Sequence, residues 1–259
     1  MKYEEDLFLL LKKLKQNEPF AFSRYSDGEV FVMQGKKLIL EKDHVIVGDL
    51  KHGFGYPDDD YKHFDPEKHK FVQEKLLEAF AFEKRNYFVG AGCGSCTCAI
   101  SPHIPWMLER YGNGEKYRTS PNLFVNSNYP IFINHFLNEF KSHDVVMVCS
   151  ENADLTGLPF NVVKDFKVGK NCIVNDHHLI EEMKGWVKDN DINGHLFLFS
   201  ASSLSEILIY ELFKDFDQNT YMDIGTTLHK HMGLGLDRNY LRAYWKGERR
   251  MEIFQSCNW

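Results

Sequence analysis

The sequence contains no apolar run that approaches the roughly 20 residues needed to cross a bilayer. It also lacks an excess of basic residues, because 31 Lys and Arg stand against 37 Asp and Glu and give a formal net charge of −6. General binding of nucleic acid depends on excess Lys and Arg, so this balance argues against a nucleic-acid partner. The first twenty residues are heavily charged and do not read as a secretory signal. We therefore expect a cytoplasmic protein without a transmembrane segment.

Internal repeats, low-complexity tracts and clear linkers are also missing, so we expect a single domain over residues 1–259. Six cysteines without a secretory signal are expected to be free thiols rather than a disulfide framework. Cys93, Cys96 and Cys98 have a spacing that suits zinc, with His103 as the nearby fourth candidate. Small residues packed at a tight turn are the interpretation that we favour for this cluster.

Short apolar segments alternate with helical patterns from Phe20 to Ile224. This alternation predicts an α/β fold, a Rossmann-like layered domain with a mainly parallel sheet flanked by helices. Strands are predicted at 20–25, 87–89, 123–126, 145–149, 172–174, 196–199 and 221–224, with a further pair at 38–40 and 45–47. Helices are predicted over 4–16 and 30–34, from Asp65-Pro66-Glu67 onward, around 133–140, and after Ser203, where Ser203 and Glu206 have the spacing of a capping box.

Residues 20–29, Phe-Ala-Phe-Ser-Arg-Tyr-Ser-Asp-Gly-Glu, run from a predicted strand into the start of a helix. Asp27 and Glu29 thus stand at the carboxyl end of a strand, where open α/β sheets bind ligands. Two carboxylates there suit a divalent cation whose shell is completed by water and phosphate oxygens. A structural interpretation is also open, and the stretch taken alone favours it, because Ser26 and Glu29 have capping-box spacing. Arg24 is then either a structural partner of these acids or a phosphate ligand.

The segment Phe22–Glu29 resembles the Arg-x-Gly-Asp-Gly-Glu opening of the GT-D-fold glycosyltransferases, a family first noticed as a bacterial domain of unknown function. Tyr221-Met-Asp-Ile-Gly-Thr-Thr-Leu228 is similar to a second family segment, Asp-(Ile or Val)-Gly-Ser, near the C-terminus. Ser26 stands where the family usually has glycine, which affects the turn but not the carboxylates. The resemblance implies a Rossmann-type enzyme in which Asp27 and Glu29, with Mn²⁺ or Mg²⁺, bind a nucleotide sugar, and it adds Asp223 to the substrate-binding residues.

On this resemblance we expect a metal-dependent hexosyl- or pentosyltransferase. It would move a sugar from a nucleotide-diphosphate sugar, with UDP as the expected nucleotide, to a hydroxyl of a glycan or a glycosylated protein. An inverting enzyme needs a base that takes the proton of the acceptor hydroxyl. Glu151 and Asp154 follow the strand at 145–149 and are candidates by position, as is His177.

Two further groups of residues are candidates for contacts with the substrate. Ser200, Ser202 and Ser203 follow a strand and open a helix, so they are expected either to contact a diphosphate or to act only as helix caps. The basic, aromatic C-terminal segment contains Arg242, Tyr244 and Trp245. We expect it to be a clamp over an anionic donor, a dock for the acceptor, or a solvated helix.

Two alternatives stay open. The glycine-rich segment Gly90–Gly94 follows a strand and resembles the cofactor loop of methyltransferases that use S-adenosylmethionine, although the usual acidic residue before it is missing. The chain would otherwise be a non-catalytic sugar-nucleotide or partner-binding module, in which Asp27 and Glu29 only cap a helix.

Overall fold

The computed structural model describes residues 2–41, 44–52, 61–91 and 101–247. Its centre is a seven-stranded sheet in the order β7-β6-β1-β11-β10-β8-β9, in which every pairing is parallel. The strands are β1 (Ala21–Tyr25), β6 (Tyr87–Ala91), β7 (Arg118–Thr119), β8 (Val145–Ser150), β9 (Val162–Val168), β10 (Leu196–Ser200) and β11 (Thr220–Asp223). The predicted α/β fold with a mainly parallel sheet is confirmed.

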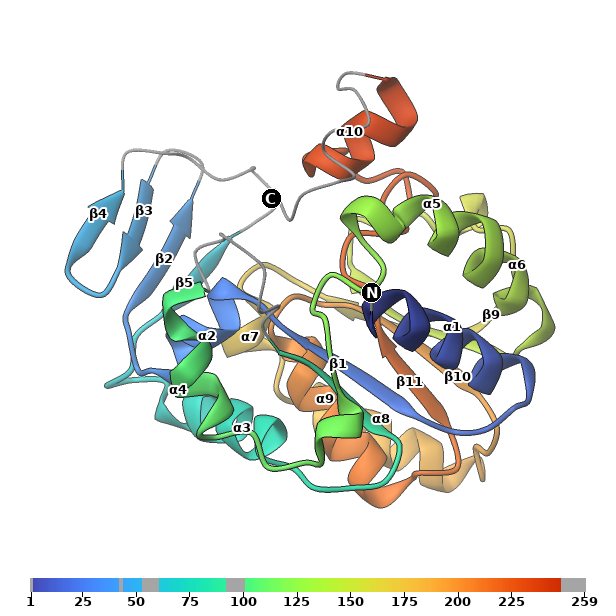
Figure 1. The fold of residues 1–259 in the computed structure, drawn as a ribbon, viewed down its shortest axis with the longest axis horizontal. Coiled ribbons are helices and arrows are strands. Elements are labelled where there is room, and N and C mark those ends of the chain that lie inside the picture. Colours follow the sequence, from blue (N-terminus) through green and yellow to red (C-terminus); the bar gives the residue numbers. More distant parts are fainter. Residues whose placement is uncertain (1, 42–43, 53–60, 92–100, 248–259) are drawn as a thin grey trace.

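Helices cover both faces of this sheet (Figure 1). One face carries α3 (Lys70–Phe80), α8 (Leu179–Asp189) and α9 (Leu204–Asp215); the other carries α1 (Lys2–Lys15), α5 (Tyr129–Ile131), α6 (Leu137–Glu139) and α10 (Asn239–Lys246). Strand β1 shows how the sequence builds the two cores, because successive side chains of a strand point to opposite faces. Ala21 and Tyr25 belong to the first core, whereas Phe20 and Phe22 belong to the second.

Short helical segments complete the described chain. They are α2 (Asp27–Met33), α4 (Ile104–Leu108), α7 (Cys172–Asn175), η1 (Ser101–His103), η2 (Glu115–Tyr117), η3 (Asn126–Asn128), η4 (Phe132–Phe136), η5 (Phe140–Ser142) and η6 (Leu155–Gly157). Over the described ranges, we find no helix with the length and apolar character that a membrane span requires.

A second, antiparallel sheet is inserted between α2 and α3 and projects from one end of the central sheet (Figure 1). Its order is β4-β3-β2-β5, with β2 (Leu38–Glu41), β3 (His44–Val47), β4 (Leu50–His52) and β5 (Lys62–Phe64). The predicted pair of strands at 38–40 and 45–47 is confirmed. Leu38, Leu40, Val45 and Phe64 are buried in the same core as α2 and α3, which fixes this inserted sheet against the central one.

Two predicted strands were wrong. Residues 123–125 form a turn that leads into η3, and Phe124 packs its ring edge-on against Phe22 with centroids 4.9 Å apart instead of entering a ladder. Residues 172–174 lie in the short helix α7, which follows Asn171 in the left-handed conformation (φ 55°). The edge strand that pairs with β8 is β9. It was not predicted, because charged residues interrupt its apolar pattern. A short apolar run does not by itself separate a strand from a buried turn or helix.

The helix predicted from Asp65-Pro66-Glu67 begins later, at Lys70. The Asp65 carboxylate accepts a hydrogen bond from the backbone N–H of Glu67 at 3.0 Å, so these residues form a turn of their own before the helix. The inner face of the helix consists of four buried residues: Val72, Leu76, Ala79 and Phe80.

Candidate functional site

The candidate site lies where β1 and β11 end. These strands are neighbours and parallel, but the segments that follow them pack on opposite faces of the sheet, α2 and α3 on one and α10 on the other. In open α/β sheets, ligands bind outside the carboxyl ends of strands at such a position. The inserted sheet also reaches this end of the central sheet (Figure 1). The two stretches that carry the family resemblance are therefore brought together, although about 200 residues separate them.

Arg24 and Asp223 form the first charged cluster of the site. Arg24 Nε donates to Asp223 Oδ2 at 3.1 Å, and the backbone N–H of Gly225 donates to Asp223 Oδ1 at 2.8 Å. Gly225 has a φ of +50°, and a Cβ there would lie 2.3 Å from Arg24 Nη2. Only glycine meets both demands without strain. Burial lowers the Arg24 pKa, but the Asp223 carboxylate together with Tyr240, Glu206 and Glu29 outweighs burial, so the pKa lies above its usual value.

Glu29, Lys62 and Ser203 form the second cluster, which joins the inserted sheet to the central one. Lys62 Nζ lies 3.3 Å from Glu29 Oε1 and 2.8 Å from Ser203 Oγ, and the Ser203 hydroxyl donates to the same glutamate oxygen. Glu29 Oε2 accepts from the backbone N–H of Ser26 at 2.9 Å, and the predicted capping box of Ser26 and Glu29 is confirmed. Burial raises the Glu29 pKa, but Lys62, Ser203 and the Ser26 amide outweigh burial and lower it to about 2.

Asp27, the first residue of α2, is partly exposed. Its Oδ1 accepts from the backbone N–H of Gly28 at 3.0 Å and from the Ser26 hydroxyl at 3.2 Å. A magnesium-type ion is commonly held by one or two carboxylates plus substrate phosphates, so Asp27 fits an ion brought by a diphosphate. Glu29 does not fit as a second ligand in this arrangement, because Lys62 and Ser203 occupy its Oε1. Across the described residues, no group of three or more His, Cys, Asp and Glu side chains is arranged to hold a metal ion.

Glu206 on α9 is part of this site and was missed as such by sequence reasoning. It is only 2% exposed, and its Oε2 has no hydrogen-bond partner among the residues that the structure describes. Burial, together with the Asp223 and Glu29 carboxylates, raises its pKa well above 4.5. The predicted capping box with Ser203 is wrong, because the Ser203 hydroxyl is bound to Glu29 and Lys62 instead. One signal was present in the sequence: Glu206 directly precedes the apolar run Ile207–Tyr210. In the structure, residues 204–213 of that helix are all buried.

The other predicted contacts are spread around the strand ends. Ser200 ends β10, Ser202 is exposed, and Ser203 is fully buried. Glu151 and Asp154 follow β8 as predicted, and both are exposed. The backbone N–H and hydroxyl of Thr156 donate to Asp154 and lower its pKa.

His177 follows α7 and packs edge-on against Phe71, with ring centroids 5.0 Å apart. Burial lowers its pKa, which favours the neutral ring.

Helix α10 packs over the loop that follows β11. The Tyr240 and Thr226 hydroxyls lie 2.6 Å apart, and Trp245 Nε1 donates to the Tyr129 hydroxyl at 2.9 Å. The Arg242 guanidinium donates to the Asp237 carbonyl at 2.7 Å and to Asn239 Oδ1 at 2.6 Å, so these bonds hold the start of its own helix. The hydrogen bonds of Arg242 and Trp245 described here are thus internal, and their role toward a substrate stays a prediction.

Part of the rival glycine-rich segment has a structural explanation. A Cβ on Gly90 would lie 2.8 Å from Pro121 Cα, so close backbone packing requires this glycine without any cofactor. Gly92, Gly94 and the cysteines Cys93, Cys96 and Cys98 lie outside the described residues, so the zinc interpretation is not addressed by the structure. His103 lies within them, with its Nδ1 3.1 Å from Gln34 Nε2.

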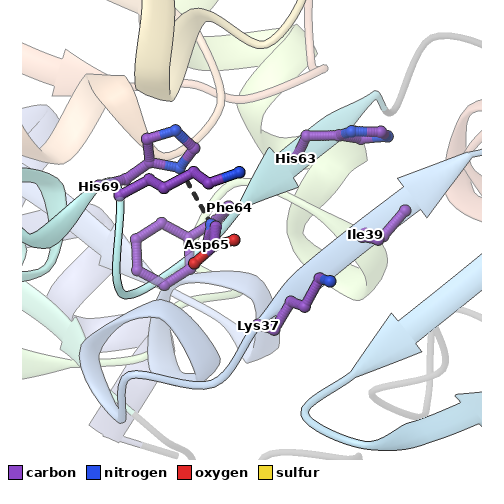
Figure 2. Close-up of a pocket in the computed structure, with 7 residues that line it drawn as sticks. Lys37, Ile39, His63, Phe64, Asp65 and His69 are labelled. Carbon is purple, nitrogen blue, oxygen red and sulfur yellow. Dashed lines mark hydrogen bonds between the residues drawn. The ribbon is translucent and has the colours of Figure 1, made fainter.

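A hollow of about 310 Å³ lies on the inserted sheet and the turn before α3 (Figure 2). Within it, the backbone N–H of Asp65 donates to His69 Nδ1 at 3.0 Å. Its lining combines both signs of charge with apolar side chains: Lys37, Ile39, His63, Phe64, Asp65, Lys68 and His69. It shares no residue with the turn that carries Asp27 and Glu29.

Comparison with known proteins gives a match at the level of the fold. No protein family model and no curated protein matches the sequence. Among solved structures, one described as the highly conserved domain of unknown function 1792 with a distinct glycosyltransferase fold is similar at a TM-score of 0.54, with 13% identity over 88% of this chain and 81% of that chain. A structure described as a new glycosyltransferase of the same kind from Streptococcus sanguinis is similar at a TM-score of 0.52, with 16% identity over 88% of this chain and 84% of that one. The fold implied by the sequence resemblance is confirmed.

Proposed function

We propose that the protein is a glycosyltransferase that moves a sugar from a nucleotide-diphosphate sugar, with UDP as the expected nucleotide, to a hydroxyl of a glycan or a glycosylated protein. One observation carries the proposal: within a fold similar to that of glycosyltransferases, Asp27, Glu29, Arg24 and Asp223 converge at the ends of β1 and β11. Caps alone would explain Ser26 and Glu29 but not the partly buried Arg24 that is paired with Asp223.

The chemistry demands positive charge at the leaving group. As the bond from sugar to diphosphate breaks, the sugar becomes oxocarbenium-like and the departing diphosphate gains negative charge. Arg24, oriented by Asp223, supplies fixed positive charge near the strand ends. Asp27 would hold the expected Mn²⁺ or Mg²⁺ together with the diphosphate oxygens, and such an ion acts as a Lewis acid toward the leaving group.

Proton transfer from the acceptor needs a base if the reaction inverts. Glu151 is our candidate, because it is exposed at the end of β8. Asp154 is less suited, since the bonds from Thr156 that lower its pKa also stabilise its carboxylate and weaken it as a base.

A binding screen tests the proposal directly. UDP, GDP, CMP and S-adenosylmethionine are each added with and without Mn²⁺, and the midpoint of thermal unfolding is recorded. A ligand present at a hundred times its Kd stabilises the fold by about 2.7 kcal/mol. We expect one nucleotide diphosphate to stabilise the protein in a Mn²⁺-dependent way and Asp27→Asn to abolish the shift.

Donor turnover provides the second readout. Because Asp27 is partly exposed and its hydrogen bonds described here are local, Asp27→Asn should leave the free energy of unfolding within about 1 kcal/mol of wild type. Release of nucleotide from the donor should fall by at least about 100-fold. Unchanged turnover would contradict the role of Asp27, and a shift with S-adenosylmethionine alone would point to a methyltransferase.

A further inference from the structure

We propose that Lys62 is the resident cation of the turn at Asp27–Glu29, so that Glu29 anchors a lysine and is not a metal ligand. The inference deepens the proposed function, since it assigns the binding of any divalent ion to Asp27 and the donor phosphates. This chain thus differs from the expected site, in which Asp27 and Glu29 both bind the metal ion.

The first argument is the occupancy of the Glu29 carboxylate. Oε1 receives the Lys62 ammonium at 3.3 Å and the Ser203 hydroxyl, while Oε2 receives the Ser26 amide. A divalent ion on Oε1 would lie about 2.2 Å from that oxygen and therefore no more than about 5.5 Å from the ammonium. The side chains of Lys62 and Glu29 are only 11% and 10% exposed, so water screens the repulsion between ion and ammonium poorly.

The second argument is that the turn is shaped around the lysine. A Cβ on Gly28 would lie 2.9 Å from Lys62 Nζ, so the glycine between the two acids makes room for the ammonium. This observation is independent of the charges, because it depends only on the space above the backbone. Gly28 thus has a function beyond the spacing of the motif.

The third argument is that the backbone of Lys62 is fixed by strand pairing. Lys62 pairs with Leu40 in the ladder between β2 and β5. Phe64, two residues further along β5, is 1% exposed in the core. Withdrawal of the ammonium would leave the buried Glu29 carboxylate without its opposite charge, which is costly. Lys62 is accordingly a positioning residue, which fixes Glu29 and neutralises it.

Titration of Mn²⁺ followed by electron paramagnetic resonance tests the proposal without nucleotide or acceptor. The proteins are wild type, Glu29→Gln, Lys62→Met and the double variant, at pH 7.5, with Asp27→Asn as the control for the remaining carboxylate. We expect weak binding by wild type that Glu29→Gln leaves unchanged within twofold. Lys62→Met should tighten Mn²⁺ binding at least tenfold by releasing Glu29, and the double variant should return to the wild-type value.

Two results would overturn the proposal: a tenfold weakening of wild-type binding by Glu29→Gln, or no tightening in folded Lys62→Met. Circular dichroism checks the fold, and if Lys62→Met does not fold, the Glu29→Gln comparison decides the question alone. Failure of all nucleotides to bind would count against the glycosyltransferase. The Mn²⁺ titrations would still decide the role of Lys62, so the two failures are distinguishable.

Discussion

Two ion pairs stand at the same end of the central sheet, and they are built differently. Arg24 and Asp223 both belong to the parallel sheet, on neighbouring strands, and their bond at 3.1 Å ties β1 to the end of β11. Glu29 and Lys62 join two different sheets, and Ser203 adds a third element to the cluster. The comparison teaches that the first pair follows from strand pairing, whereas the second depends on where the inserted sheet packs.

Removal of the Lys62 charge is expected to have the largest effect on stability. Lys62→Met leaves the Glu29 carboxylate buried and unpaired, which should lower the free energy of unfolding by about 3–5 kcal/mol. The double variant with Glu29→Gln should recover most of this loss, because no charge remains buried. Denaturation in urea measures both.

Lys70→Met is the matched control, since Lys70 pairs with Glu74 on the surface and its side chain is 74% exposed. We expect a change of no more than about 0.5 kcal/mol there. Equal losses for Lys62→Met and Lys70→Met would show that the Glu29 pair is no more important than a surface pair.

Acid should break the second pair selectively. The folded pKa of Glu29 is about 2, below the ordinary value of 4.5, so its contribution is complete above pH 4.5 and is lost as the pH falls toward 2. The shift corresponds to about 3 kcal/mol. Urea denaturation should show that the free energy of unfolding of wild type declines across this pH range, and that the decline is smaller by this amount in Glu29→Gln. Equal declines in the two proteins would contradict the prediction.

A substitution at Gly225 tests the Arg24–Asp223 pair, because Gly225 donates to Asp223 and lies against Arg24. Gly225→Ala combines a φ of +50° with a Cβ placed 2.3 Å from Arg24 Nη2, and we expect a loss of about 2 kcal/mol. Gly48→Ala is the control, because Gly48 has a φ of +61° but no atom within 4 Å of the added Cβ, and its loss should be about 1 kcal/mol. Equal losses in thermal or urea unfolding would mean that the close approach to Arg24 contributes nothing.

Glu206 should show the smallest effect below pH 4.5. There it is protonated in both the folded and the unfolded chain, so Glu206→Gln should change the free energy of unfolding by less than about 1 kcal/mol at pH 4. As the pH rises from 4.5 toward the raised folded pKa, the unfolded chain ionises and the fold does not, so wild type loses stability and the variant should exceed it at neutral and alkaline pH. A large loss at pH 7 would show instead that Glu206 is a charged partner within the first pair.

The sequence by itself determined the alternation of strands and helices, the turn that presents Asp27 and Glu29, and the strand that ends at Asp223. These features are local, because apolar periodicity and turn chemistry act over a few residues. The same local rules predicted strands at 123–126 and 172–174. In the structure, the first segment is a turn whose Phe124 packs against Phe22, and the second lies in the short helix α7.

Only the tertiary structure decided what faces the carboxylates. Lys62 lies 33 residues from Glu29 in a segment whose pattern carries no sign of a buried charge, and Ser203 lies 174 residues away. Glu206 reads as a helix cap until α9 is seen to be buried against β1, where its carboxyl loses contact with water. The physical reason is that the free energy of a charge depends on its partners and its burial. Both are set by the packing of elements that are distant in the chain.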